Sequence, residues 1–183
     1  RSVAPDFSIV LDPNERFENP EGAIQVSRSL ESFDRVTFES PVPQDRLDWY
    51  VALRKQIPQT IALHLTSMAQ LLPAIRAEAA DDYNLLGALK PFVEWAQLVH
   101  HAGGRTWRGT GMDLGVRDMS SVHAAAVAGC ELPCDIIGTL LREDDLIVNP
   151  IRFEDGSLLV PDAPGLGVEL DRDALERYRV PVE

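Results

Sequence analysis

The sequence predicts an α/β fold built around a parallel β-sheet. Short apolar segments alternate with longer amphipathic segments along most of the chain, which is the pattern of strands joined by crossover helices. Proline and glycine punctuate the junctions between these segments. A chain of 183 residues that is 45% hydrophobic and 25% charged is typical of one globular domain, or part of a larger one.

Each expected strand is rich in β-branched and aromatic residues and is bounded by turn-forming residues. Five strands are expected at residues 7–11, 35–39, 60–65, 82–86 and 105–108. The segments between them repeat apolar residues with helical periodicity. Helices are expected at about residues 20–33, 45–56, 68–79, 90–101 and 119–128.

The alternation ends after Pro133. Short strands are expected over residues 147–153 and 157–160, with a turn at the Glu-Asp-Gly of residues 154–156. A last helix is expected at residues 171–178, because its first turn is acidic and thus favourable at a helix start.

Charge and cysteine content exclude several function classes. A net charge of -12 makes nucleic acid or an anionic membrane a poor partner. No apolar run approaches the roughly 20 residues that span a bilayer, and no signal peptide is visible, so a cytoplasmic location is expected. Cys130 and Cys134 have no second cysteine pair, which favours two reduced thiols over a metal site or a disulfide.

Carboxylates close the first two predicted strands. Asp12 follows the first strand, Glu39 ends the second, and a proline follows each within two residues. The carboxyl ends of parallel strands meet at one edge, where active sites of α/β barrels lie. Taken singly, Asp12 would be a turn or capping residue and Glu39 a solvated charge. Together they favour a site for a hard divalent cation.

The other strand ends carry further candidates. His64 lies near the end of the third strand, where it is equally consistent with a structural role and with metal ligation. Asn84 lies on the fourth strand, and Trp107 and Arg108 end the fifth. Arg108 could grip a substrate carboxylate or pair with a surface acid. The glycine-rich loop at residues 109–115 is a weak anion-binding signal.

Several segments resemble the enolase superfamily, and within it the mandelate racemase/muconate lactonizing branch. The most specific match is Pro-Gly-Leu-Gly-Val-Glu-Leu near the C-terminus. The matching segments are residues 10–14, 38–43, 142–148, 153–156 and 160–171. The resemblance implies the C-terminal part of a (β/α)7β TIM-type barrel, without the N-terminal capping domain and first strands.

The resemblance also implies a metal site. Such enzymes bind Mg2+ through acids at successive strand ends, and the cation stabilises an enediolate formed by removing the proton next to a carboxylate. Asp12 falls on the first ligand, Glu39 on the second, and Asn14 on a neighbouring family position. The third ligand position falls on Leu65, so His64 would have to substitute. A histidine nitrogen suits Mn2+ or another divalent ion better than Mg2+.

The catalytic positions depart from the family pattern. Asn84 lies near the position of the lactonizing branch's lysine base, and Trp107 and Arg108 replace the racemase histidine. The resemblance therefore leaves Asn84, Arg108 and Asp113 as candidate catalytic residues, with Asp113 an alternative acid or base. Asn14, Trp107 and Arg108 are the candidates for binding the substrate.

On this basis residues 1–135 would form barrel βα units from the third strand onward. Residues 136–183 would hold the final barrel strand and a segment returning towards the capping domain. The expected activity is that of an acid-sugar dehydratase, racemase or cycloisomerase acting on a small carboxylate. The expected partners are the missing N-terminal half and further copies, as a dimer or octamer. The alternative is a catalytically degenerate member with a binding or structural role.

Overall fold

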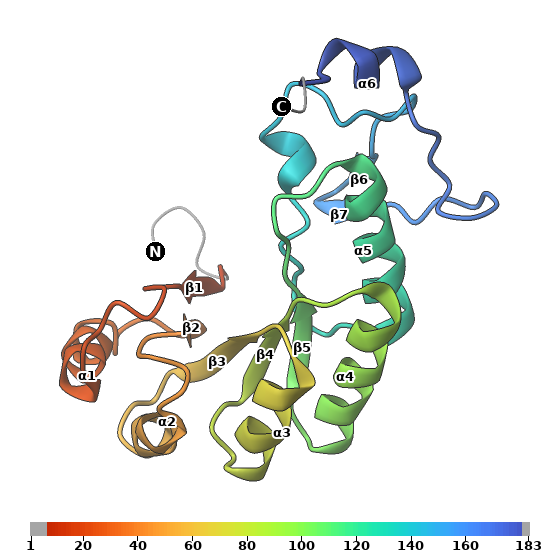
Figure 1. Cartoon of the computed structure of the whole chain (residues 1–183). Coiled ribbons are helices and arrows are strands. Elements are labelled where there is room, and N and C mark those ends of the chain that lie inside the picture. The colour runs from red at the N-terminus through yellow and green to blue at the C-terminus, as the bar shows by residue number, and fades with distance from the viewer. Residues whose placement is uncertain (1–6, 181–183) are drawn as a thin grey trace.

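A five-stranded parallel sheet with crossover helices forms the centre of the computed structural model, which describes residues 7–180 (Figure 1). The strands lie in sequence order, each beside the next, as right-handed βαβ units place them. This confirms the α/β fold expected from the sequence. The strands are β1 (Ile9–Leu11), β2 (Val36–Glu39), β3 (Thr60–Leu65), β4 (Asp82–Leu85) and β5 (Arg105–Arg108). The helices between and after them are α1 (Pro20–Ser29), α2 (Leu47–Arg54), α3 (Met68–Arg76), α4 (Leu89–His101) and α5 (Gly115–Ala128).

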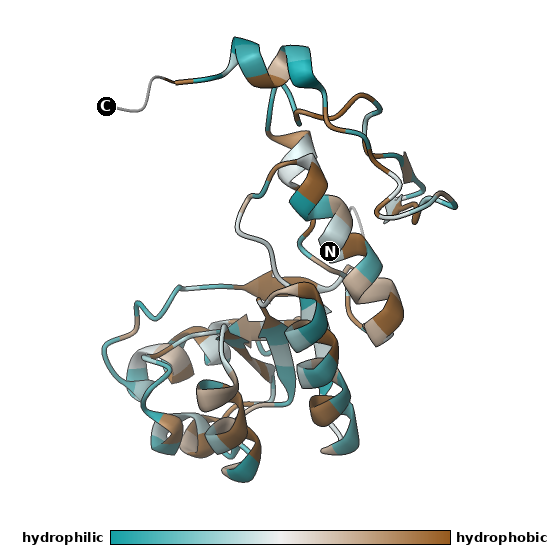
Figure 2. Cartoon of the chain, turned by 45° about the vertical axis from the view of Figure 1, so that its right-hand side comes forward, coloured by the Kyte–Doolittle hydropathy of each residue, from teal (hydrophilic) through white to brown (hydrophobic). Residues whose placement is uncertain are grey.

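One face of the sheet is apolar and packs against helices. Alternate strand residues point to it, and Figure 1 shows α1 to α4 along this side of the strands. The helices contribute large buried side chains, among them Tyr50 of α2, Leu71 of α3 and Phe92 of α4. Figure 2 shows hydrophobic and hydrophilic residues alternating along these helices, as expected when one stripe faces a core. The strand residues in this core are Val36, Phe38, Ile61, Leu63, Leu65, Tyr83 and Leu85.

The opposite face of the sheet is polar. Glu39 pairs in register with Ala62, and His64 pairs with Asn84, which in turn pairs with Trp107. Because neighbouring residues in register share a face, these side chains line one surface towards the carboxyl ends of the strands. The sheet therefore separates a helix-covered core from a polar face, and the curved sheet with its outer helices forms half of a barrel.

Several element boundaries differ from the expectation, and helices α1 to α3 end two to four residues before their expected ends. Helix α5 begins at Gly115, four residues before the expected start at Met119. Its first turn carries Asp118, which is buried and paired with Arg142 at 2.7 Å, so a distant ion pair extends the helix. The strands expected over residues 147–153 and 157–160 shrink to a two-stranded hairpin, β6 (Phe153–Glu154) and β7 (Ser157–Leu158).

The segment after α5 lies beside β5. The backbone N–H of Leu132 donates to the carbonyl of Thr106 at 3.3 Å, and that of Asp135 donates to Arg108 at 2.9 Å. The strand-like partner of β5 thus lies at residues 132–135, before the residue 136 at which the second segment was expected to begin. A short 3-10 helix (Gly138–Leu140) and helix α6 (Arg172–Arg177) follow.

Ser67 caps helix α3, and its removal gives a local test of the fold. Its hydroxyl accepts a hydrogen bond from the backbone N–H of Gln70 at 3.3 Å. We expect Ser67→Ala to lower the free energy of unfolding by about 1 kcal/mol, because that N–H loses its partner. Urea denaturation would measure the change. Ser32→Ala, at an exposed position outside the helices and strands, is the control and should change stability little.

Among residues 7–180, no helix has both the length and the apolar character needed to cross a membrane.

Candidate functional site

Glu39 is the centre of the polar face. It ends β2, and its side chain is only 6% exposed. The pKa of the Glu39 carboxyl is raised from 4.5 to about 7, chiefly by burial and also by the negative charges of Asp12 and Asp135, although a hydrogen bond from Asn84 acts in the opposite direction. A buried acid that titrates near neutrality, among other acids, is a feature of functional sites rather than of a structural core.

Asn84 joins Glu39 to a second acid. The Asn84 amide Nδ2 donates to Glu39 Oε1 at 2.7 Å and to Asp135 Oδ2 at 3.3 Å. The indole Nε1 of Trp107 donates to the same Asp135 oxygen at 3.0 Å. Loss of hydration raises the pKa of Asp135, although these hydrogen bonds and the nearby His64 act in the opposite direction. Strands β2, β4 and β5 are thus connected through side chains on the polar face.

His64 faces the same cluster. Its Nδ1 lies 3.7 Å from Glu39 Oε1, and two-thirds of its side chain is shielded from solvent. Among the described residues, the buried His64 Nε2 and Asn84 Oδ1 have no hydrogen-bond partner. Leu65, by contrast, is 2% exposed and packs in the helix-facing core. The strand alternation therefore gives the polar position to His64, which needs no rearrangement to face Glu39.

Asp12 lies at the exposed end of β1, close enough for its charge to act on Glu39 and Asp135. Asn14 organises this turn, because its backbone N–H donates to Asp12 Oδ1 at 2.9 Å. Its backbone is left-handed, with φ of 51°. The structure therefore places Asn14 next to the candidate ligand Asp12, where its backbone positions the carboxylate.

Arg108 and Asp113 are not brought to this cluster. Arg108 belongs to the opposite, helix-facing side of β5, where it is 1% exposed and lies over the Phe92 ring at 4.8 Å. Its neighbour Trp107 takes the polar face, because adjacent strand residues alternate. Asp113 accepts from the backbone of Gly111 and lies 3.8 Å from Arg117, within its own loop and the start of α5. The expected placement of Arg108 at the mouth is thus corrected.

Asp135 is the site residue that the sequence reasoning missed. It ends the segment at residues 132–135, which pairs with β5 but shows no recognisable strand pattern in the sequence. Its sequence gives little local signal, because Pro133 interrupts the two apolar residues, Leu132 and Cys134, that precede Asp135.

The donors of the cluster suit a cation in charge and atom type. Asp12, Glu39 and Asp135 bring three carboxylates to one mouth, and the unpaired His64 Nε2 offers a nitrogen. Within residues 7–180, however, no three His, Cys, Asp or Glu side chains are arranged to hold a metal ion. A cation here would need oxygen ligands from water or substrate in addition, as is usual for Mg2+.

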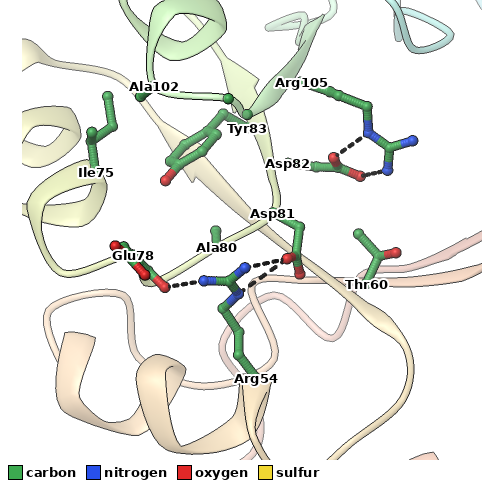
Figure 3. Close-up of a pocket in the computed structure, with 12 residues that line it drawn as sticks. Arg54, Thr60, Ile75, Glu78, Ala80, Asp81, Asp82, Tyr83, Ala102 and Arg105 are labelled. Carbon is green, nitrogen blue, oxygen red and sulfur yellow. Dashed lines mark hydrogen bonds and ion pairs between the residues drawn. The ribbon is translucent and has the colours of Figure 1, made fainter.

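A separate cavity of about 490 Å³ lies at the amino ends of the strands (Figure 3). Both of its arginines are already paired with acids of the same cavity. Arg54 donates to Asp81 at 3.1 Å, and Arg105 makes two 2.8 Å hydrogen bonds to Asp82. With these groups satisfied, the polar cluster around Glu39 remains the stronger candidate site.

Comparison with known proteins finds relatives over most of this chain. Muconate cycloisomerase 1 of Rhodococcus opacus is 27% identical over 175 residues, which cover 92% of this chain and 47% of that protein. The N-succinyl-L-Arg/Lys racemase of Bacillus cereus is 25% identical and covers 97% of this chain and 49% of its own length. The chain therefore spans about half the length of the curated relatives it matches.

Comparison with solved structures finds the same family of proteins. A mandelate racemase/muconate lactonizing family protein from Azoarcus sp. EbN1 matches with a TM-score of 0.87 and 26% identity, over 100% of this chain and 53% of that one. The family model described as "Enolase C-terminal domain-like" matches residues 1–174. This chain therefore belongs to the enolase superfamily, as a C-terminal barrel domain of the mandelate racemase/muconate lactonizing type.

Proposed function

We propose that this chain forms the barrel half of an enzyme that removes the proton next to the carboxylate of a small substrate, in a racemase, cycloisomerase or dehydratase. The observation that carries the proposal is the buried Glu39, whose pKa is raised to about 7 among Asp12, His64 and Asp135. Burying several carboxylates without a compensating positive charge destabilises the folded protein. Such a cluster is therefore more readily explained by ligand binding than by a role in folding. The cycloisomerase and racemase relatives support the reaction class.

Asp12, Glu39 and His64 are the residues that would hold a divalent cation. When bound, it would supply positive charge to offset the charge that develops on the substrate carboxylate oxygens. The His64 nitrogen favours Mn2+ or a similar ion, and the two carboxylates favour Mg2+. Asn84 orients Glu39, and the indole of Trp107 orients Asp135, through the hydrogen bonds described above.

The group that takes the proton is proposed to come from outside this chain. Asn84 is neutral and already donates to two carboxylates, so it cannot serve as a base. Asp135 is a second acid on the polar face, beside Glu39, whose raised pKa favours its holding a proton. Completion of the barrel by further polypeptide, and assembly into an oligomer, are part of the same proposal.

A catalytically degenerate relative is the second candidate. Two observations favour it: the neutral Asn84 in contact with Glu39, and the lack of a ready group of three ligands among the described residues. Such a protein would keep the pocket for binding without turnover. The two candidates differ in whether a divalent cation binds at the cluster.

The test is a calorimetric titration of Mg2+ and Mn2+ into the metal-stripped full-length protein. We expect one equivalent to bind, and Asp12→Asn to weaken the binding by about tenfold or more, because a ligand is lost. Asp113→Asn is the matched control, since that acid also follows a strand but lies outside the cluster. Absence of binding for both ions, or equal losses in the two variants, would favour the degenerate relative.

A further inference from the structure

The amide of Asn84 has its two ends in different surroundings. Its Nδ2 donates to Glu39 at 2.7 Å and to Asp135 at 3.3 Å. Because carboxylate oxygens accept hydrogen bonds, the NH2 group must lie on their side and Oδ1 must point away from them. That oxygen is buried and has no hydrogen-bond partner among the described residues. The two acids thus fix the orientation of the amide, and packing has to accommodate Oδ1.

Gly109 leaves the space that Asn84 Oδ1 occupies. It is the first residue after β5, and its backbone lies against the Asn84 amide. A methyl group on its Cα would lie 3.1 Å from Asn84 Cγ, and closer still to Oδ1. Carbon atoms that are not bonded pack at about 3.5–4.0 Å. A side chain at position 109 and the present orientation of Asn84 therefore exclude each other.

The backbone of Gly109 is held in place on both sides. Its N–H donates at 3.2 Å to the carbonyl of Leu85, the residue after Asn84. The preceding residue, Arg108, accepts at 2.9 Å from the backbone N–H of Asp135. Asn84 itself is 3% exposed, so it has no solvent to move into. A clash at Gly109 would consequently be relieved by moving the Asn84 amide against the two acids.

Backbone conformation does not account for the glycine at position 109. Gly103 and Gly129 have left-handed backbones, whereas the φ of Gly109 lies outside that region. Gly111, in the same loop, is also outside it, and a methyl group there would make an ordinary contact with Asp113 at 3.5 Å. The two loop glycines thus differ in whether a side chain would displace Asn84, which makes Gly111 a matched control.

We propose that Gly109 is a positioning residue of the polar cluster, whose missing side chain keeps the Asn84 amide in the orientation that Glu39 and Asp135 share. The loop after β5 then sets how Glu39 is presented to a cation, and this consequence rests on the proposed function. The indole of Trp107 reports on the same arrangement, because it donates to the Asp135 oxygen that also accepts from Asn84.

The first test is a double-mutant cycle of Gly109→Ala and Asn84→Ala, followed by urea denaturation of the full-length protein with a chelator. We expect Gly109→Ala to raise the unfolding equilibrium constant by about tenfold or more, as overpacked sites do. With Asn84→Ala already present, it should carry no penalty, because the clashing amide is gone. Gly111→Ala should not destabilise the protein in either background. If Gly109→Ala alone does not fold, the double variant should still fold.

Equal penalties for Gly109→Ala in the two backgrounds would mean that the loop itself needs the glycine, and would overturn the proposal. So would a double variant that does not fold while Asn84→Ala does. These outcomes involve no metal, so they are independent of the proposed function.

The second test reads the polar cluster itself. 19F NMR of 5-fluorotryptophan in the metal-free protein follows Trp107, whose signal is assigned by its loss in Trp107→Phe. Gly109→Ala should shift this signal, and the double variant should match Asn84→Ala. A Trp107 signal that Gly109→Ala leaves unchanged would overturn the positioning role.

A titration with Mn2+ connects the positioning role to the proposed function. Gly109→Ala and Asn84→Ala should weaken binding by the same factor, and their combination should weaken it no further. If the parent binds Mn2+ and Gly109→Ala binds it equally well, the positioning role is overturned. If the parent binds no cation, the proposed function fails, while the stability cycle and the Trp107 signal still decide the role of Gly109.

Discussion

Glu39→Gln should raise the free energy of unfolding by about 3 kcal/mol above neutral pH while removing the proposed cation ligand. The carboxylate is buried, and its pKa is raised from 4.5 to about 7, which corresponds to roughly 3 kcal/mol of unfavourable ionisation in the folded state. Glutamine is neutral and keeps an oxygen that can accept from Asn84. The substitution therefore removes the cost of ionisation and leaves the hydrogen bond.

The sign of the pH dependence follows from which state binds more protons. Between pH 4.5 and about 7 the folded protein retains the Glu39 proton that the unfolded chain has lost. Stability contributed by this group is fully present below pH 4.5 and is lost as the pH rises to about 7. The advantage of Glu39→Gln over the parent should consequently be small at low pH and reach its full value above pH 7.

Urea denaturation of both proteins at about pH 5 and about pH 8, in the presence of a chelator, measures this difference. Glu154→Gln, which removes an exposed acid from the β6–β7 hairpin, is the matched control and should behave alike at both pH values. If Glu39→Gln gained no stability between the two pH values, Glu39 would be an ordinary acid and the main support for the proposed site would be lost.

The fold could be predicted because local and long-range signals agree. Each strand of the sheet carries β-branched or aromatic residues on the helix-facing side, such as Phe38 and Ile61, and each is followed by a helix with an apolar stripe. Parallel order and crossover connections then follow from chain geometry. The start of α5 was misplaced because it depends on Asp118 pairing with Arg142, a contact across 24 residues that no local pattern reports.

The candidate site was predictable in part for the same reason. Asp12, Glu39 and His64 lie at or near successive strand ends, so topology alone places them together. Asp135 was missed because its segment pairs with β5 through only two backbone hydrogen bonds and is too short to show a strand pattern. Arg108 was expected on the polar face, but adjacent strand residues point to opposite faces, and Trp107 takes the polar side.

The two arginines of β5 should respond oppositely to the same substitution. Arg105 is half-exposed and makes two hydrogen bonds to Asp82, which is itself 1% exposed. Arg105→Met leaves that buried carboxylate without a partner. We expect it to lower the free energy of unfolding by about 3 kcal/mol, the low end for a broken buried pair, because water can enter where the exposed guanidinium was.

Arg108→Met should instead raise the free energy of unfolding, by about 2 kcal/mol. The guanidinium is 1% exposed, no salt bridge is seen for it, and its Nε and Nη1 have no partner among the described residues. Burial lowers the pKa of Arg108, which shows that its charged form is disfavoured there. Methionine has similar length and can keep the packing on Phe92. The substitution therefore removes two unsatisfied donors and loses one hydrogen bond, from Arg108 Nη2 to Ser121 Oγ at 3.2 Å.

Arg108→Ala separates packing from charge. It removes the same donors but also the contact with Phe92, so it should be less stable than Arg108→Met. Urea denaturation of the three variants at one pH gives the comparison. Because Arg108 lies on the helix-facing side, metal binding at the cluster should be unchanged in Arg108→Met. If Arg108→Met were less stable than the parent and no longer bound the cation, Arg108 would contribute to the polar face, as its position near the strand end first suggested.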